Sequence, residues 1–405
     1  MRSADTPPTA SPPPRSPAIE GATEDLRALD DLRLKVRAFF NLVLPEALAG
    51  CEGRLERARA WRGALYDAGF AGLGYPAEFG GHGGSDAEAA VYHEESRGRI
   101  PPEEDIFAIG VRMALPIVRD LGSPELKARF VRPGLSGEEI WCQLYSEPGA
   151  GSDLASLSTS ALRDGDEWVI NGQKVWTSGA QHSQMGILLA RSDPHAPKHR
   201  GITMFVLPME QPGVTVRPLR QMTGVAEFNE VFFDNARIPR SWVVGDVNDG
   251  WRAAIALLGY ERVATGTLSV DRADTSRLKA GRVPIPVSQL ADLAGALGRR
   301  GDPLVRQDLA RLYSGEKIMG WLGRREVHPS IGKLWRTLQG RAAAQVAHLL
   351  ALSGGASWEP DDADRDYFAY HILNCRAMSI GGGTDEIQRN TLAEKALGMP
   401  RDPFS

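Results

Sequence analysis

The segment WCQLYSEPGAGSDLA, residues 141–155, combines small residues and hydroxyls in a pattern suited to a flat, phosphorylated ligand. Gly149 and Gly151 carry no side chain, so a ligand can approach the backbone closely there. Ser146 and Ser152 supply hydroxyls, and the backbone N–H groups of Gly151 and Ser152 can donate to phosphate or carbonyl oxygens. A lone G-x-G is equally typical of an ordinary turn, so this interpretation depends on the rest of the chain.

Two pairs of acidic residues lie in or beside glycine-rich segments, where carboxylates serve structure as often as catalysis. Glu147 and Asp153 belong to the segment 141–155, and we expect them to cap or brace its turn. Asp385 and Glu386 begin a predicted C-terminal helix, whose positive dipole end is stabilised by acids. Neither pair is the first candidate for a catalytic base.

The predicted elements change in kind twice along the chain. Residues 26–138 place apolar side chains at helical spacing, whereas residues 139–246 contain short β-branched and aromatic runs bounded by turn residues. Helix-length apolar patterns return over residues 247–405. We therefore expect an α+β fold with an N-terminal helical domain, a middle antiparallel β domain and a C-terminal helical domain.

Two turns are predicted inside the β region. The dipeptide Asn171-Gly172 separates the runs 168–170 and 174–176, which is typical of a β-hairpin. Asp164-Gly165 marks an earlier turn. The sequence therefore predicts chain reversals at both places.

Composition and charge exclude several classes of function. The 405 residues include 47 basic and 51 acidic side chains, so the chain lacks the strongly basic surface that nucleic-acid binding requires. The three cysteines, Cys51, Cys142 and Cys375, are odd in number and form no C-x-x-C, so we expect neither a disulfide framework nor a metal site. This usage fits a reducing, cytoplasmic compartment. No apolar run approaches the roughly 18 residues that span a bilayer.

The first 25 residues form a proline-rich leader. Five prolines fall between Pro7 and Pro14, which excludes a helix there. The segment also lacks the apolar core of a secretory signal. We expect residues 1–25 to be disordered, with a polyproline docking tail as the alternative.

Five blocks, in order, closely resemble the acyl-CoA dehydrogenase family, and the resemblance extends from about residue 26 to the C-terminus. It implies a helical domain, a β domain and a C-terminal four-helix bundle. It also implies FAD, usually bound across a dimer interface within a tetramer, and hence a homo-oligomer. The blocks are PAEFGGHGG (76–84), YSEPGAGSD (145–153), WVINGQKVWTSGA (168–180), NEVFFDNARIP (229–239) and GGGTDEIQRNTLAEKALGMPRDP (381–403).

The resemblance assigns the FAD contacts residue by residue. Trp176 matches the aromatic residue packed on the back face of the flavin, and Thr177 and Ser178 match its hydrogen-bonding edge, including N5. The expected FAD-binding residues are Tyr145, Ser146, Gly151, Ser152, Trp176, Thr177, Ser178, Thr384 and Glu386.

The family chemistry requires a carboxylate for the α-proton, a flavin for the β-hydride and a polarised thioester carbonyl. Many members carry the glutamate directly before G-T in the last block, where this chain has Gly382. A smaller group, acting on branched or long acyl chains, carries it in an E-R pair on a helix, and Glu261 and Arg262 match that pair. Most helical glutamates are solvated, but the apolar flanks here indicate a buried helix. We therefore expect Glu261 to be the base. The expected substrate contacts are Ser152, Gly259, Arg262 and Gly382.

The chain departs from the family pattern at three places. Glu386 replaces a more usual glutamine. No clear R-x-x-F-G segment, which in many members reaches the partner's FAD, is found between Asp271 and Gln289. The Q-x-x-G-G site is half present as LSGGAS, residues 352–357.

Three functions remain open. The first is dehydrogenation of an acyl-CoA or acyl-carrier thioester to the 2-enoyl thioester, with electrons passing to an electron-transferring flavoprotein or a similar acceptor. The second is a flavin-dependent oxygenase or oxidase on the same fold, which Glu261 disfavours. The third is a non-catalytic subunit of a heteromeric dehydrogenase. Because Gly382 and Gly259 are small, we expect a branched, long or polycyclic acyl group.

Overall fold

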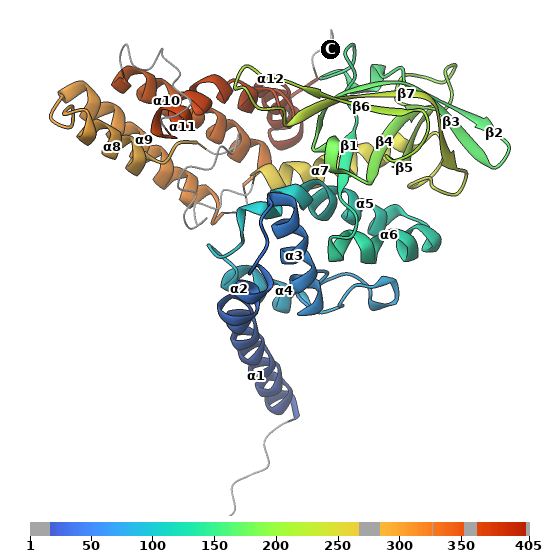
Figure 1. Ribbon diagram of the computed structural model, residues 1–405, viewed down its shortest axis with the longest axis horizontal. Helices are drawn as coiled ribbons and strands as arrows, with labels where there is room; N and C mark the ends of the chain where they lie inside the picture. The colour runs from blue at the N-terminus through green and yellow to red at the C-terminus, as the bar shows by residue number, and fades with distance from the viewer. Residues whose placement is uncertain (1–16, 267–283, 326, 352–362, 402–405) are drawn as a thin grey trace, which may run out of the picture.

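The computed structural model describes residues 17–266, 284–325, 327–351 and 363–401, in the order helices, β-sheet, helices (Figure 1). This arrangement confirms the predicted α+β fold class. The N-terminal helices are α1 (Pro17–Ala38), α2 (Leu44–Ala47), α3 (Arg54–Asp67), α4 (Asp86–Glu95), α5 (Leu115–Leu121) and α6 (Pro124–Ser136).

Helix α1 begins at Pro17, within the segment 1–25 for which the sequence predicts disorder. Proline suits the first helical position because the N–H that it lacks would have no partner there. Residues 1–16, which hold the five clustered prolines, lie outside the described residues.

The middle part is a β-sheet. Across the described residues the sheet has seven strands in the order β1-β4-β2-β3-β7-β6, with β5 paired to β4. The strands are β1 (Trp141–Leu144), β2 (Ser160–Asp164), β3 (Glu167–Ser178), β4 (Met185–Arg191), β5 (Ile202–Pro208), β6 (Val214–Leu219) and β7 (Phe228–Pro239). Most neighbours are antiparallel, but β1 pairs with β4 in parallel. Hairpin signals in a sequence report only on neighbouring antiparallel strands, so they could not predict this pair.

The predicted hairpin at Asn171-Gly172 is wrong. Strand β3 continues through both residues, and the ladder to β7 only shifts register there. Gly172 has a φ of 146° and approaches Thr159 so closely that an added Cβ would lie 2.6 Å from its hydroxyl. This glycine therefore serves a bulge and a close approach rather than a turn. The chain reverses at the earlier signal, where Asp164 pairs with Glu167 across a two-residue turn.

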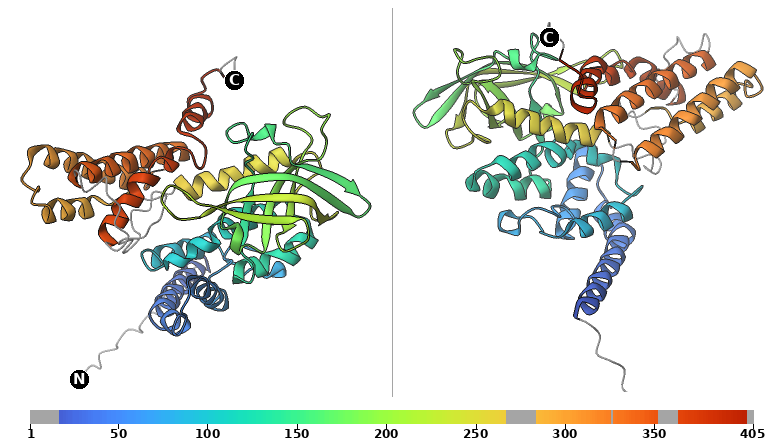
Figure 2. Two further views of the ribbon diagram at one scale, coloured as in Figure 1. Left: turned by 45° about the horizontal axis from the view of Figure 1, so that its top comes forward. Right: turned by 180° about the vertical axis from the view of Figure 1, so that it is seen from behind.

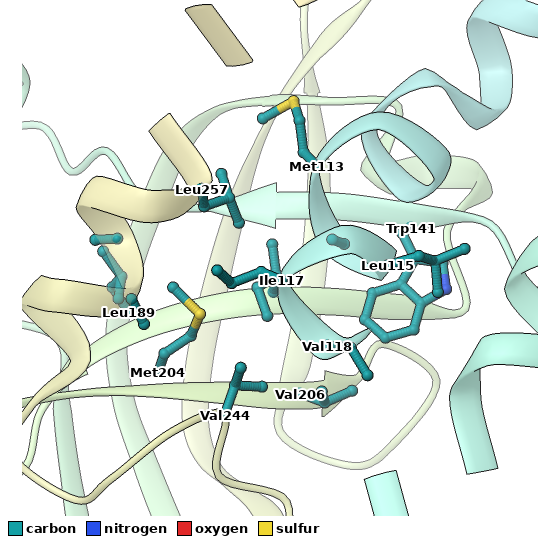
Figure 3. Close-up of a cluster of buried hydrophobic side chains, with 14 of the residues drawn as sticks. Met113, Leu115, Ile117, Val118, Trp141, Leu189, Met204, Val206, Val244 and Leu257 are labelled. Carbon is teal, nitrogen blue, oxygen red and sulfur yellow. The ribbon is translucent and has the colours of Figure 1, made fainter. Parts of the chain in front are cut away.

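The main core lies where helix α7 (Gly250–Gly266) crosses the sheet (Figure 2). α7 contacts β5 on one side and α5 with its preceding π-helical turn (Gly110–Ala114) on the other. Figure 3 shows side chains from all three layers meeting in this cluster: Met113, Leu115, Ile117 and Val118 from the helices, Trp141, Leu189, Met204 and Val206 from the sheet, Val244, and Leu257 from α7. This packing fixes α7, and with it the face of α7 that carries Leu257, against the sheet.

The C-terminal helices gather around α10 (Figure 1). α10 contacts α7 and each of the other described C-terminal helices. No helix in the described ranges is both long and apolar enough to cross a membrane. The bounds are α8 (Val287–Ala296), α9 (Pro303–Leu322), α10 (Pro329–Ala351), α11 (Ala363–Asn374) and α12 (Asp385–Thr391).

Candidate active site

The 145–153 loop follows β1 and is closed by two backbone hydrogen bonds. The N–H of Glu147 donates to the carbonyl of Ala150, and the N–H of Ala150 donates to the carbonyl of Glu147. The nitrogen–oxygen distance is 3.0 Å in both. Beyond this closure Gly151 and Ser152, which the sequence predicts to meet the phosphates, are exposed. The loop therefore presents its small residues to solvent from a fixed turn.

A buried ion pair anchors the 145–153 loop to β3. The Glu147 carboxylate accepts hydrogen bonds from the N–H groups of Ser158 (2.7 Å) and Thr159 (2.9 Å) and from Nζ of Lys174 (2.9 Å). Lys174 is fully buried, and its Nζ also donates to the carbonyl of Tyr145 at 2.9 Å. The predicted bracing role of Glu147 is thus confirmed.

The ionisation of this pair follows from its surroundings. Burial opposes the charge on Glu147, but Lys174 and the hydrogen-bond donors outweigh it and lower the pKa of the carboxyl to about 2. Burial also lowers the pKa of Lys174, to about 8, against the opposing pull of Glu147. The two groups carry opposite charges at neutral pH and satisfy each other inside the protein.

Asp153 braces the far end of the loop. Its carboxylate accepts a hydrogen bond from Oγ of Ser156 and forms an ion pair with Nζ of Lys198, each at a distance of 2.6 Å. Both Asp153 and Lys198 are exposed, and exposed pairs of this kind contribute little free energy. The bracing role predicted for Asp153 is confirmed at the surface.

Trp176 lies in a β-bulge. The ladder between β3 and β7 shifts register between Lys174 and Thr177, so Val175 and Trp176 interrupt regular pairing. Trp176 adopts a φ of 62° and is 61% exposed. Its ring and that of Phe228 are in a T-shaped contact, with the ring centroids 6.0 Å apart. A large aromatic side chain held out of the sheet in a left-handed backbone suits stacking against a planar ligand.

The bulge and the 145–153 loop lie side by side. The N–H of Val175 donates to the carbonyl of Ser146 at 2.9 Å. Ser146 and Ser178 are half-buried, and Thr177 is fully buried. The structure therefore brings together the residues predicted to surround the isoalloxazine.

Two buried hydroxyls at this junction find no hydrogen-bond partner among the described residues: those of Tyr145 and Thr177. A buried polar group left without a partner costs about 1–3 kcal/mol, so such groups call for an explanation. Polar edges on a bound ring supply one. The exposed indole, the two hydroxyls and the accessible glycine turn fit a flavin dinucleotide. No group of three or more potential metal ligands gathers in the parts of the chain that the structure describes.

Glu261 lies on α7, four residues after Leu257 and hence on the same face. Leu257 and Tyr145 belong to one buried cluster. Burial raises the pKa of the Tyr145 hydroxyl well above its usual value, and the negative charge of Glu261 raises it further. The Glu261 side chain is half-buried and close enough for its charge to act on Tyr145 in the 145–153 loop.

The turn of α7 that carries Glu261 is tied to α5 through its neighbour. The hydroxyl of Tyr260 makes a short hydrogen bond to Asp120, which also accepts from Nε of Arg119 at 2.7 Å. Gly259, just before it, is open: an added Cβ would meet no atom of the described residues within 4 Å. Arg262 lies on α7, but its side chain is outside the described residues.

The third predicted group lies in the loop before α12. Gly382 and Gly383 have φ values of 71° and 83°, and the carbonyl of Gly382 accepts from Nε2 of Gln388 at 2.7 Å. Thr384 caps α12 through the N–H of Ile387. Glu386 is exposed and lies 4.0 Å from Arg389.

This loop is anchored to α10. Lys333 pairs with Asp385 at 3.1 Å, and Oγ of Ser330 donates to Gln388 at 2.6 Å, both in buried surroundings. The placement of Asp385 in the first turn confirms its predicted structural role. Thr384 and Glu386 are therefore held in place by α10, whereas the 145–153 loop is held by β3.

Sequence reasoning missed Lys174, Asn229 and Tyr260. Lys174 occurs inside a predicted strand, where a lysine normally points to solvent, and its partner Glu147 is 27 residues away in the chain, so no local signal indicated its burial. Asn229 is fully buried beside Thr177, and Tyr260 directly precedes the predicted base.

Comparison with known proteins places this arrangement among known enzymes. Residues 27–138 match the family model for the acyl-CoA dehydrogenase N-terminal domain, and residues 142–236 match that for the middle domain. Acyl-CoA dehydrogenase IpdE1 of Mycobacterium tuberculosis is 37% identical over 400 residues, covering 93% of this chain and 99% of the relative.

Comparison with solved structures points to the same family of enzymes. The Tcur3481-Tcur3483 steroid ACAD has 29% identity and a TM-score of 0.70, covering 96% of this chain and 99% of that one. The ChsE4-ChsE5 complex from Mycobacterium tuberculosis has 26% identity and a TM-score of 0.67, covering 93% and 98%.

Fold and matches together define an oxidoreductase that acts on CH–CH bonds. More particularly, the chain belongs to the acyl-CoA dehydrogenase family. That family is FAD-dependent, so the predicted cofactor and class of enzyme are confirmed.

Proposed function

We propose that this chain oxidises the α,β carbon–carbon bond of an acyl-CoA thioester, with Glu261 removing the α-proton. The observation that supports the proposal is the position of Glu261 on α7, four residues after Leu257, whose buried cluster also contains Tyr145 of the 145–153 loop. When bound, FAD supplies the acceptor for the hydride that leaves the β-carbon.

Gly382 supports this choice of base. The position that carries the glutamate in many members has no side chain here, so its loop cannot supply a carboxylate. Its backbone N–H remains available to hold the thioester carbonyl and so acidify the α-proton. The hydrogen bond from Gln388 to the Gly382 carbonyl and the anchors on α10 fix this loop in place.

Tyr145 contributes as a neutral donor. Burial and the nearby Glu261 charge keep its pKa well above the usual value, so its hydroxyl stays protonated at neutral pH. It can donate a hydrogen bond to the acyl group, to the ring edge or to Glu261. Trp176 and the exposed Gly151–Ser152 backbone serve the ring face and the phosphates.

The decisive experiment replaces Glu261 with glutamine, which keeps the shape and removes the base. We expect the variant to retain FAD, with an unchanged visible spectrum, and to lose about 10²- to 10⁴-fold in the rate of anaerobic flavin bleaching by an acyl-CoA. The exposed Glu46→Gln variant on α2 is the control and should bleach normally. Near-normal bleaching by Glu261→Gln would remove the assignment.

The acyl group proposed for this site is bulky: branched, long or polycyclic. Gly259 is open and Gly382 carries no side chain, and a solved relative of 29% identity is described as a steroid ACAD. Bleaching should therefore be faster with a steroid-side-chain or long branched acyl-CoA than with butyryl-CoA. A preference for butyryl-CoA would contradict this. We further propose an electron-transferring flavoprotein or similar carrier as acceptor.

A second candidate, a subunit that acts only together with a different dehydrogenase chain, is favoured by the relatives. The Tcur3481-Tcur3483 enzyme and the ChsE4-ChsE5 complex are each named for two proteins. Bleaching of the lone protein by acyl-CoA, together with its mass in solution, decides between this candidate and a homo-oligomeric dehydrogenase.

A further inference from the structure

Trp176 is an exception among the described residues with positive φ. The other non-glycine residues in this region of the Ramachandran map are Asn235 and Asn248. Asparagine tolerates the left-handed conformation because its short side chain bonds locally, whereas a bulky aromatic does not. Something in the surrounding structure must therefore hold Trp176 in place.

Regular β-sheet hydrogen bonds do not hold Trp176 in this conformation. Pairing with β7 is regular from Gly172 to Lys174 and resumes at Thr177, so the ladder breaks at the strained residue. Side chains on either side of the break supply fixed points instead.

The first fixed point lies two residues before Trp176. Nζ of Lys174 donates to the carbonyl of Tyr145 and to Glu147, each at 2.9 Å. Lys174 is fully buried and Glu147 nearly so. The N–H of Val175 adds a 2.9 Å bond to the 145–153 loop. The backbone entering the bulge is thus pinned from one side.

The second fixed point lies directly after Trp176. Nδ2 of Asn229 donates to the carbonyl of Thr177 at 2.9 Å and to Oε1 of Gln181 at 2.6 Å. Asn229 and Thr177 are fully buried and face each other in register. The backbone leaving the bulge is pinned by a side-chain amide.

We propose that the Lys174–Glu147 pair and the Asn229 amide are positioning groups that hold Trp176 in its left-handed conformation, so that the indole is presented ready-made to the flavin. The inference rests on the proposed function only in that FAD occupies this site. These residues act through Trp176 and do not contact the reacting atoms. Pre-organisation of this kind lowers the ordering cost of binding, so its loss weakens FAD retention.

A double-mutant cycle tests this. Asn229→Ala and, separately, Glu147→Gln are made in the wild type and in a Trp176→Gly background, where no indole needs positioning. FAD dissociation is measured by diluting the holoenzyme and following the fluorescence of released FAD. We expect each change to raise the Kd for FAD at least tenfold in the wild type and less than threefold in the Trp176→Gly background.

The matched control is Glu167→Ala, which removes another β3–β7 side-chain bond, from Arg237 at 3.1 Å, at the end of β3 far from the bulge. Its Kd should be unchanged. Equal losses in both backgrounds, or no loss in either, would overturn the inference, because the residues would then support the fold generally. If Asn229→Ala does not fold, Glu147→Gln carries the test. Because the readout is FAD release, absence of thioester turnover would refute the proposed function and leave this inference standing; failure of the wild type to bind FAD would refute both.

Discussion

The strain at Trp176 can be measured by comparing glycine with alanine at this one position. Both substitutions remove the same indole and the same edge contact with Phe228, so these losses cancel in the comparison. At an ordinary strand position alanine is the more stable by roughly 0.5–1 kcal/mol, because glycine loses more conformational freedom on folding. At a φ of 62° alanine instead pays a left-handed penalty of about 1–2 kcal/mol, which glycine avoids.

The expected sign is therefore reversed at this position. Trp176→Gly should exceed Trp176→Ala in free energy of unfolding by about 0.5–1 kcal/mol, the difference between these two opposing terms. Urea denaturation of the apo proteins provides the measurement, with Gln173→Gly and Gln173→Ala as the control pair on the same strand, where alanine should be the more stable. Both Trp176 variants should bind FAD less tightly than the wild type. An alanine variant more stable than the glycine variant at position 176 would refute the claim of backbone strain.

Two further predictions follow from buried groups near the same loop. Because the folded pKa of Glu147 is lowered to about 2 from an ordinary 4.5, its ionised form contributes on the order of 3 kcal/mol that is present above pH 4.5 and lost as pH falls toward 2. Glu147→Gln should therefore be less stable than the wild type at pH 7, and the gap between their urea midpoints should narrow as pH falls to 3; a constant gap would contradict the assignment. Tyr145→Phe removes a buried hydroxyl that lacks a partner among the described residues, so the apo protein should be as stable as the wild type or up to about 1 kcal/mol more stable, while turnover falls. A clear loss of apo stability would show that the hydroxyl has an internal partner.

The parts of the site that the sequence predicts are those encoded by local chemistry. The segment around Ser146 and Gly151 forms a turn after a strand because its glycines and proline permit little else. Glu261 lies on a helix with one buried face, the face that carries Leu257, because the side chains there are apolar. Trp176 is exposed at the strand end that the family pattern implies.

What the sequence does not predict depends on partners far along the chain. Gly172 occupies a bulge rather than a hairpin because Thr159 approaches it across the sheet, which no local pattern records. Lys174 points inward because Glu147, 27 residues away, receives it. The parallel pairing of β1 with β4 similarly brings together strands separated by two others in the chain. Long-range register is the information that single-segment patterns lack.

The extra residue in β3 has a consequence for chain length. Val175 and Trp176 together oppose a single residue of β7, so deleting one of them would leave a regular ladder in which Thr177 still pairs with Asn229. The two-residue connection after Asp164 carries no side chain of the site, and its flanking residues Asp164 and Glu167 are exposed and half-buried. Loop grafts and reporter insertions belong at that connection, whereas a one-residue deletion at the bulge would remove the left-handed backbone that presents the Trp176 indole.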